Sequence, residues 1–156
     1  MKAEDLITRW GLLPLPDEGG YYKETYRSEE TDGERNFSTA IYYMLTRESH
    51  SKLHRLKSDE VYHFYFGDPV QMLLLYPNGE SRVIFLGHNY LASQKSQFVI
   101  PRGTWMGSMV IEGELGYAFM GTTVSPGFDF RDFELGDREE LIGMFPQHKG
   151  LIQDLT

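Results

Sequence analysis

The sequence predicts an all-β domain of short antiparallel strands, arranged as a sandwich, a jelly roll or a small barrel. The middle of the chain is a series of short segments rich in aromatic and β-branched residues, and turn signals separate them. A content of 10 Tyr, 10 Phe and 16 Gly also suits many strands joined by tight turns. The length of 156 residues fits one domain, and no repeat or linker divides residues 1–156.

A short helix is predicted near each end of the chain. Residues 3–10 place apolar side chains at helical spacing, and Gly11 follows as a stop signal. Near the C-terminus, Asp137 and Glu140 form a capping-box pattern ahead of a short apolar group. Pro146 is expected to end this second helix.

Between the helices, the pattern predicts a succession of strands and turns. A proline-containing stretch, residues 12–16, is expected to stay extended ahead of the first strand. The predicted strands are residues 21–27, 37–46, 60–66, 70–76, 80–86, 97–100, 104–111 and 115–124. The polar run 28–35 predicts an exposed loop, 77–79 a hairpin turn and 112–114 the connection between the last two strands. Residues 128–135 alternate apolar and charged side chains.

Composition excludes several classes of function. The chain has 15 Lys and Arg against 23 Asp and Glu, which argues against a nucleic-acid partner because phosphate backbones require clustered positive charge. No stretch approaches the roughly 18 apolar residues of a membrane span, and the N-terminal start lacks the apolar run of a signal peptide. Cysteine is absent, which excludes a thiolate nucleophile. We therefore expect a soluble, cytoplasmic domain without a membrane partner.

The residues best suited to chemistry gather between positions 50 and 63. His50, His54 and His63 lie there together with Asp59 and Glu60, all within 14 residues. Imidazole and carboxylate side chains suit either a divalent metal ion or a proton-transfer pair with the histidine titrating near neutral pH. We expect neighbouring strands to direct His54 and Glu60 into one cavity, as the catalytic candidates.

Strand alternation sorts the residues around Glu60 by face. Tyr62 and Phe64 share the face of Glu60 and are predicted to bind a ligand as aromatic walls, with core packing as the alternative. His63 follows Glu60 by an odd number of residues, so it is expected to face away, toward packing or a dimer interface.

Further ligand-binding candidates come from other parts of the chain. Glu24 and Arg27 lie on an early strand, where an arginine near a cavity suits a phosphate or a carboxylate. The alternative is that the two residues form an exposed pair on an edge strand. Trp105 is a candidate for stacking on a flat ring. The aromatic content together with Arg27 predicts a partly apolar, anionic ligand.

Four stretches of the sequence together resemble one branch of the cupin superfamily, the cupin-5 or DUF985 group of predicted sugar-epimerase-like cupins. They are residues 15–28, 54–68, 99–105 and 123–136. The resemblance implies a cupin double-stranded β-helix, or jelly roll, with short terminal helices. It also implies a homodimer and a cavity for a small-molecule ligand inside the barrel.

The cupin motifs are only partly matched at the positions that usually bind metal. His54 and Glu60 stand at ligand positions of the first motif. Leu56 and Met106 stand at two further ligand positions, and two protein ligands rarely hold a metal alone. No cofactor is therefore firmly predicted, although a divalent metal on His54 and Glu60 is an alternative.

Three functions stay open. The first is an isomerase or epimerase of a sugar or sugar nucleotide, with His54 as general base and a cavity tyrosine as acid. A distant similarity to deoxysugar-nucleotide 3,5-epimerases implies it, because residues 20–24, with Tyr22 and Glu24, are similar to their early strand and His54 occupies the place of their base. The second is a metal-dependent cupin that adds His50 or His63 as a ligand, and the third is a non-catalytic small-ligand-binding protein.

Overall fold

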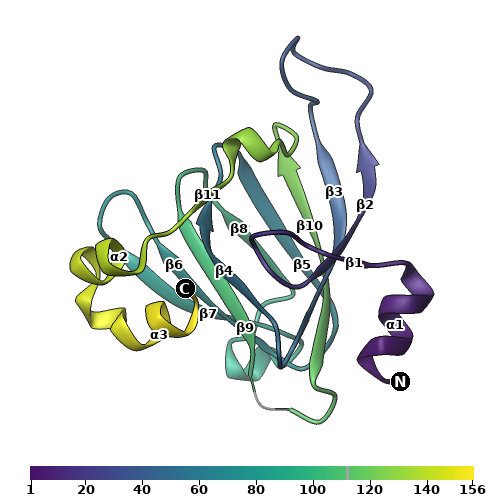
Figure 1. The fold of residues 1–156 in the computed structure, drawn as a ribbon. Coiled ribbons are helices and arrows are strands. Elements are labelled where there is room, and N and C mark those ends of the chain that lie inside the picture. The colour runs from purple at the N-terminus through teal and green to yellow at the C-terminus, as the bar shows by residue number, and fades with distance from the viewer. Residues whose placement is uncertain (112) are drawn as a thin grey trace.

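Two antiparallel β-sheets pack face to face in the computed structural model, which describes residues 1–111 and 113–156 (Figure 1). The six-stranded sheet has the order β1-β2-β3-β10-β5-β8, and the five-stranded sheet has the order β11-β4-β9-β6-β7. This arrangement confirms the predicted all-β jelly roll with short terminal helices.

The strands are β1 (Leu13–Pro14), β2 (Tyr21–Arg27), β3 (Thr39–Thr46), β4 (His50–Arg55), β5 (Asp59–Gly67), β6 (Val70–Leu75), β7 (Ser81–Leu86), β8 (Gln97–Ile100), β9 (Trp105–Val110), β10 (Tyr117–Ser125) and β11 (Glu134–Leu135). The α-helices are α1 (Ala3–Trp10), α2 (Arg138–Met144) and α3 (Lys149–Asp154). Short 3-10 turns cover Tyr90–Ala92, Phe130–Asp132 and Pro146–His148. None of the helices in the described part of the chain has the length and apolar character that crossing a membrane requires.

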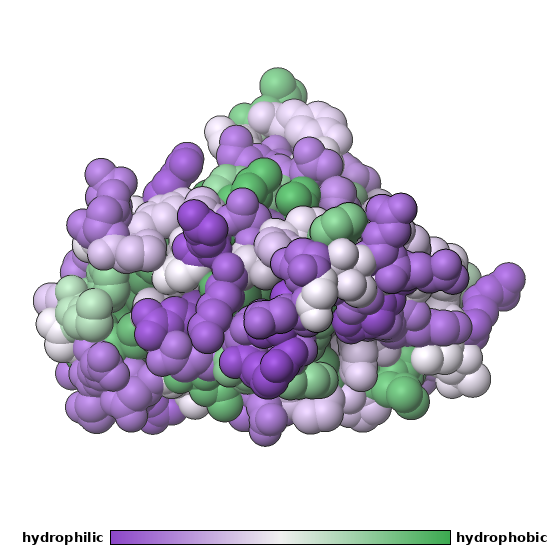
Figure 2. Space-filling view, turned by 90° about the horizontal axis from the view of Figure 1, so that it is seen from above, coloured by the Kyte–Doolittle hydropathy of each residue, from purple (hydrophilic) through white to green (hydrophobic). Residues whose placement is uncertain are grey.

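Alternating side chains divide the apolar residues into three clusters. The largest lies between the two sheets and contains Leu45, Met72 and Met106. A second cluster forms where α2 and α3 cover the outer face of the five-stranded sheet, and a third forms where α1 covers the outer face of the other sheet (Figure 1). Seen from above, the surface is mainly hydrophilic, and its apolar side chains form small separate groups (Figure 2).

The structure adds elements in three places that the sequence pattern left undefined. Residues 50–55 form strand β4, which carries His54 as expected but for which the pattern gave no bounds. The helix α2 ends at Met144, just before Pro146, as predicted, and Pro146 then opens a 3-10 turn that leads into α3, a helix that was not predicted. Residues 128–135, for which no element was predicted, hold a 3-10 turn and the two residues of β11. The connection predicted at 112–114 falls partly outside the described residues, because Glu112 is not among them.

Candidate functional site

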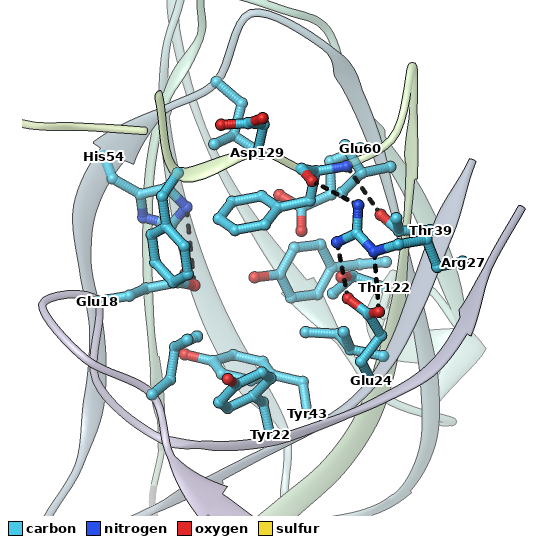
Figure 3. A pocket seen from close by; sticks show the side chains of 17 residues that line it. Glu18, Tyr22, Glu24, Arg27, Thr39, Tyr43, His54, Glu60, Thr122 and Asp129 are labelled. Atoms are coloured by element: carbon cyan, nitrogen blue, oxygen red, sulfur yellow. Dashed lines mark hydrogen bonds and ion pairs between the residues drawn. The ribbon is translucent and has the colours of Figure 1, made fainter. Parts of the chain in front are cut away.

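A pocket of about 360 Å³ lies between the two sheets (Figure 3). Its size falls at the small end of the range for small-molecule sites, which is roughly 300–1,000 Å³. The lining combines apolar, aromatic and charged side chains from both sheets and from the loops that follow β1 and β10. These are Leu15, Glu18, Tyr22, Glu24, Arg27, Thr39, Ile41, Tyr43, His54, Leu56, Glu60, Tyr62, Thr122, Val124, Phe128, Asp129 and Phe130.

His54 is the only histidine that lines this pocket among the described residues, and its ring is held on three sides. Nδ1 lies 2.7 Å from the backbone oxygen of Lys52, so the Nδ1–H group donates to that carbonyl. Nε2 lies 3.7 Å from a carboxylate oxygen of Glu18, and the ring stacks on Phe133 at 5.1 Å. Since Nδ1 is committed to the backbone, Nε2 is the atom that is left to accept or release a proton.

Glu18 is a site residue that the sequence reasoning missed. Its carboxylate accepts a hydrogen bond from Ser51 Oγ at 3.1 Å, and its backbone oxygen accepts one from Lys52 N–H at 2.8 Å. The next residue, Gly19, has φ +101°, and a Cβ there would lie 2.2 Å from the His50 backbone oxygen. Only glycine allows the loop to approach β4 this closely. The available signal was the position of Glu18 within residues 15–28, one of the stretches that resemble the family.

Glu60 enters the pocket from β5, in the sheet opposite to His54 (Figure 3). It is 7% exposed, and no Lys or Arg of the described residues forms a salt bridge with it. Burial raises the pKa of Glu60 to about 7, and the negative charge of Glu18 adds to the rise. The charge of His54 and the hydroxyl of Thr122 oppose that rise. Glu60 is therefore a carboxyl group that changes charge near neutral pH.

Tyr43 and Tyr62 stand beside Glu60 on the six-stranded sheet. Their rings meet edge to face, with centroids 6.3 Å apart, and the Tyr43 hydroxyl donates to the Gly19 backbone oxygen at 2.8 Å. Burial raises the pKa of both phenols well above the ordinary value. Both hydroxyl groups consequently stay protonated at neutral pH.

Tyr22, Glu24 and Arg27 line the pocket from β2, as the sequence predicts. The guanidinium of Arg27 donates two hydrogen bonds to the Glu24 carboxylate, at 2.9 and 2.8 Å (Figure 3). Its Nη1 donates to Asn36 Oδ1 and to the Phe128 backbone oxygen. Because Arg27 is already paired with a carboxylate, it does not supply the free positive charge on which the anionic-ligand prediction rested.

Two of the predicted ligand-binding residues do not reach the pocket. Phe64 is packed in the core between the sheets, with His88 edge-on to its ring at 5.0 Å, because it lies further along β5 than the pocket extends. Trp105 packs against the cluster under α2 and α3, with the guanidinium of Arg55 4.3 Å over its ring. Its neighbour Met106 points into the core between the sheets, so Trp105 points to the outer face.

The side chains of this cavity do not fit a divalent metal. Leu56 and Met106 line the space next to His54 and offer no charged or imidazole ligand. His63 is bonded instead to Thr123 and Gln97, facing away from the pocket. Within residues 1–111 and 113–156, no group of three or more His, Cys, Asp or Glu side chains could hold a metal ion. We therefore derive the chemistry of the site from the protein side chains.

A jelly roll with a pocket between its two sheets is an architecture that cupins share. Oxalate decarboxylase from Bacillus subtilis shares this fold, with a TM-score of 0.59 and 16% identity over 93% of this chain and 37% of that chain. The chain belongs to the Cupin_5 family of the cupin superfamily, DUF985, whose model matches residues 4–136.

Proteins from three distant organisms are similar to most or all of the chain. A hypothetical protein from Leishmania major has a TM-score of 0.91 and 36% identity, covering 100% of this chain and 99% of that chain. Protein SO0799 from Shewanella oneidensis has a TM-score of 0.92 and 37% identity, covering 100% and 98%. The uncharacterized protein YML079W of Saccharomyces cerevisiae is 34% identical over an alignment of 147 residues, and the match covers 83% of this chain and 72% of that protein.

Proposed function

We propose that this cupin binds a small, sugar-sized molecule and acts on it as an isomerase or epimerase, with His54 as the general base. The observation that carries the proposal is the buried pair of His54 and Glu18 facing the pocket. With Nδ1 fixed on the backbone oxygen of Lys52, Nε2 faces Glu18 at the pocket, where a general base is required.

The reaction requires a base and an acid on opposite sides of the substrate. Nε2 of His54 takes the proton from a carbon next to a carbonyl, and the electron pair of the broken C–H bond moves onto the carbonyl oxygen. Tyr62 gives its hydroxyl proton to the other face of that carbon as the electron pair returns from the oxygen to form the new C–H bond, and solvent then takes the proton from His54 and supplies one to the phenolate. In support, His54 belongs to the five-stranded sheet and Tyr62 to the six-stranded sheet, with the pocket between them.

The size and charge of the pocket favour a sugar over a sugar nucleotide. A volume of about 360 Å³ suits a molecule of about the size of a monosaccharide. A nucleotide diphosphate requires several free cationic donors, whereas Arg27 is paired with Glu24. The proposal therefore takes the sugar alone as the substrate.

Solvent exchange tests the proposal. Glucose, mannose, fructose, glucosamine and mannosamine would each be incubated with the protein in D₂O, and proton NMR would follow deuterium at the carbon next to the carbonyl. We expect exchange with at least one sugar and its loss by roughly 10²- to 10⁴-fold in His54→Asn. Tyr62→Phe is expected to retain exchange but to lose formation of the epimer.

His63→Asn is the matched control, because His63 lies on the other face of the neighbouring sheet, bonded to Thr123 and Gln97. The His63→Asn variant should catalyse deuterium exchange into the sugar at the rate of the unmodified protein. If the unmodified protein exchanges none of these sugars faster than His54→Asn does, the proposed function is wrong.

A further inference from the structure

The charged side chains of the pocket are mutually paired with one exception. Glu24 is paired with Arg27 by two hydrogen bonds, and Glu18 faces His54 at 3.7 Å. Asp129 is paired at the rim, where it accepts hydrogen bonds from the guanidinium of Arg131 at 3.0 and 2.8 Å. Among the described residues, Glu60 is the carboxylate of this pocket for which no cationic partner within 4.0 Å is found.

Glu60 is also the carboxylate for which a missing partner has the largest consequence. It is 93% buried, because only 7% of its surface is exposed, and it lines the pocket directly. An ionised carboxylate in such a place is costly unless a positive charge approaches it. The nearby negative charge of Glu18 makes the ionised state still less favourable.

The aromatic walls of the pocket suit a cation as well. Tyr22, Tyr43, Tyr62, Phe128 and Phe130 line the same space. The face of an aromatic ring attracts a positive charge, and this attraction grows where water is excluded. The carboxylates and the aromatic faces of the pocket therefore both favour a cationic ligand.

We propose that the ligand of this pocket carries a protonated amine on a sugar-sized polyhydroxy skeleton, and that Glu60 binds the ammonium group. This inference deepens the proposed function and rests on it for the reaction, because an ammonium substituent on the carbon that His54 deprotonates withdraws electrons and makes that proton more acidic. The hydroxyl groups of Thr39, Thr122 and Tyr62 are then available to the hydroxyl groups of the ligand.

Three probes with one six-carbon skeleton isolate the charge of the ligand. Glucamine (1-amino-1-deoxysorbitol) is a cation, sorbitol is neutral and gluconate is an anion. Calorimetric titration of the full chain should show glucamine binding at least about tenfold more tightly than sorbitol, which corresponds to about 1.4 kcal/mol, and gluconate binding most weakly. If glucamine binds no more tightly than sorbitol or gluconate, or if none of the three binds, the inference is wrong.

The dependence of binding on pH identifies Glu60 as the partner. The groups that face Glu60 are Glu18 from the loop after β1, His54 from β4, Tyr43 from β3 and Tyr62 from its own strand. Glucamine should bind several-fold more tightly at about pH 8 than at about pH 6, because Glu60 ionises over this range.

Two variants test whether the charge of Glu60 causes the preference for glucamine. Glu60→Gln keeps the size of the side chain and should remove the preference for glucamine over sorbitol. Glu139→Gln removes the same charge from the exposed first turn of α2 and should leave the preference unchanged. If Glu60→Gln retains the preference, Glu60 is not the ammonium partner and the inference is wrong.

Failure of the inference can be distinguished from failure of the proposed function, because none of the three probes contains the aldehyde or ketone that the proposed reaction requires. A preference for glucamine that depends on Glu60, without exchange of any sugar in D₂O, would support the ammonium site and contradict the proposed enzymatic function. Exchange that depends on His54, without a preference for glucamine, would support the proposed enzymatic function and contradict the ammonium site.

Discussion

Glu60 is the side chain whose charge depends most clearly on folding. Its pKa rises from the ordinary value of 4.5 to about 7 in the folded protein. Between these two pH values, the folded chain holds a proton that the unfolded chain has released. The free energy of unfolding therefore decreases as pH rises from about 4.5 to about 7, and this contribution levels off above that range.

The variant Glu60→Gln should remove this pH dependence, because the amide cannot ionise. At about pH 8 the variant should be more stable than the unmodified protein by on the order of 3 kcal/mol, and at about pH 4.5 the two should be nearly equal. Urea unfolding at both pH values measures the difference. A constant difference between the two proteins from pH 4.5 to 8 would show that Glu60 does not titrate with the raised pKa.

The residues of the site were predictable where one short stretch of sequence carries them. His54 and Glu60 were found from their spacing, and both line the pocket. A pair between Arg27 and Glu24 was the alternative to ligand binding, although residues three apart on a regular strand face opposite sides. A bulge in β2 between Glu24 and Tyr26 brings both side chains to the same face.

At the scale of elements, a strand was expected to carry His54, but the bounds of β4 were missed because its sequence lacks the pattern of a strand with an apolar inner face. Ser51 and His54 are polar and yet buried, where both contact Glu18, and the register of β4 on β9 shifts between them. The outward residue Leu53 is covered by the C-terminal segment, where its backbone N–H donates to the Leu155 oxygen. The formation of this strand therefore depends on tertiary packing and not on the local sequence pattern.

The C-terminal helices should stabilise the five-stranded sheet from outside without shaping the pocket. Phe145 is 2% exposed within the cluster formed by α2, α3 and the sheet. Phe145→Ala should lower the free energy of unfolding by roughly 3–5 kcal/mol, measured by urea unfolding, because it leaves a cavity in that cluster.

The adjacent residue Met144 supplies the control, since it is 59% exposed. Met144→Ala should change the free energy of unfolding by no more than about 0.5 kcal/mol. Similar losses in both variants would mean that the helices contribute through their own stability and that packing of Phe145 on the sheet is not the cause.

For the whole molecule, the all-β class was predictable from the regular succession of short strands and turns along the chain, and the family resemblance selected the jelly roll among the all-β architectures. The pocket between the sheets was implied by the family resemblance, but its charge balance was not. That balance depends on which side chains pair across loops and strands, as Asp129 does with Arg131. The homodimer and the cytoplasmic location stay predictions.

The net charge of −8 bears on which ligands this molecule attracts, because it adds a long-range field of the same sign as the pocket carboxylates. A cationic ligand should therefore bind more weakly as salt screens that field, over a Debye length of roughly 10 Å at 0.1 M ionic strength. We expect the affinity for glucamine to fall several-fold between about 0.02 and 0.5 M sodium chloride, while the affinity for sorbitol stays constant. Titration calorimetry at the two concentrations measures both. If the affinity for sorbitol falls in parallel, the effect of salt is due to general changes in the protein. If the affinity for glucamine does not change with salt, the attraction is limited to direct contact with Glu60.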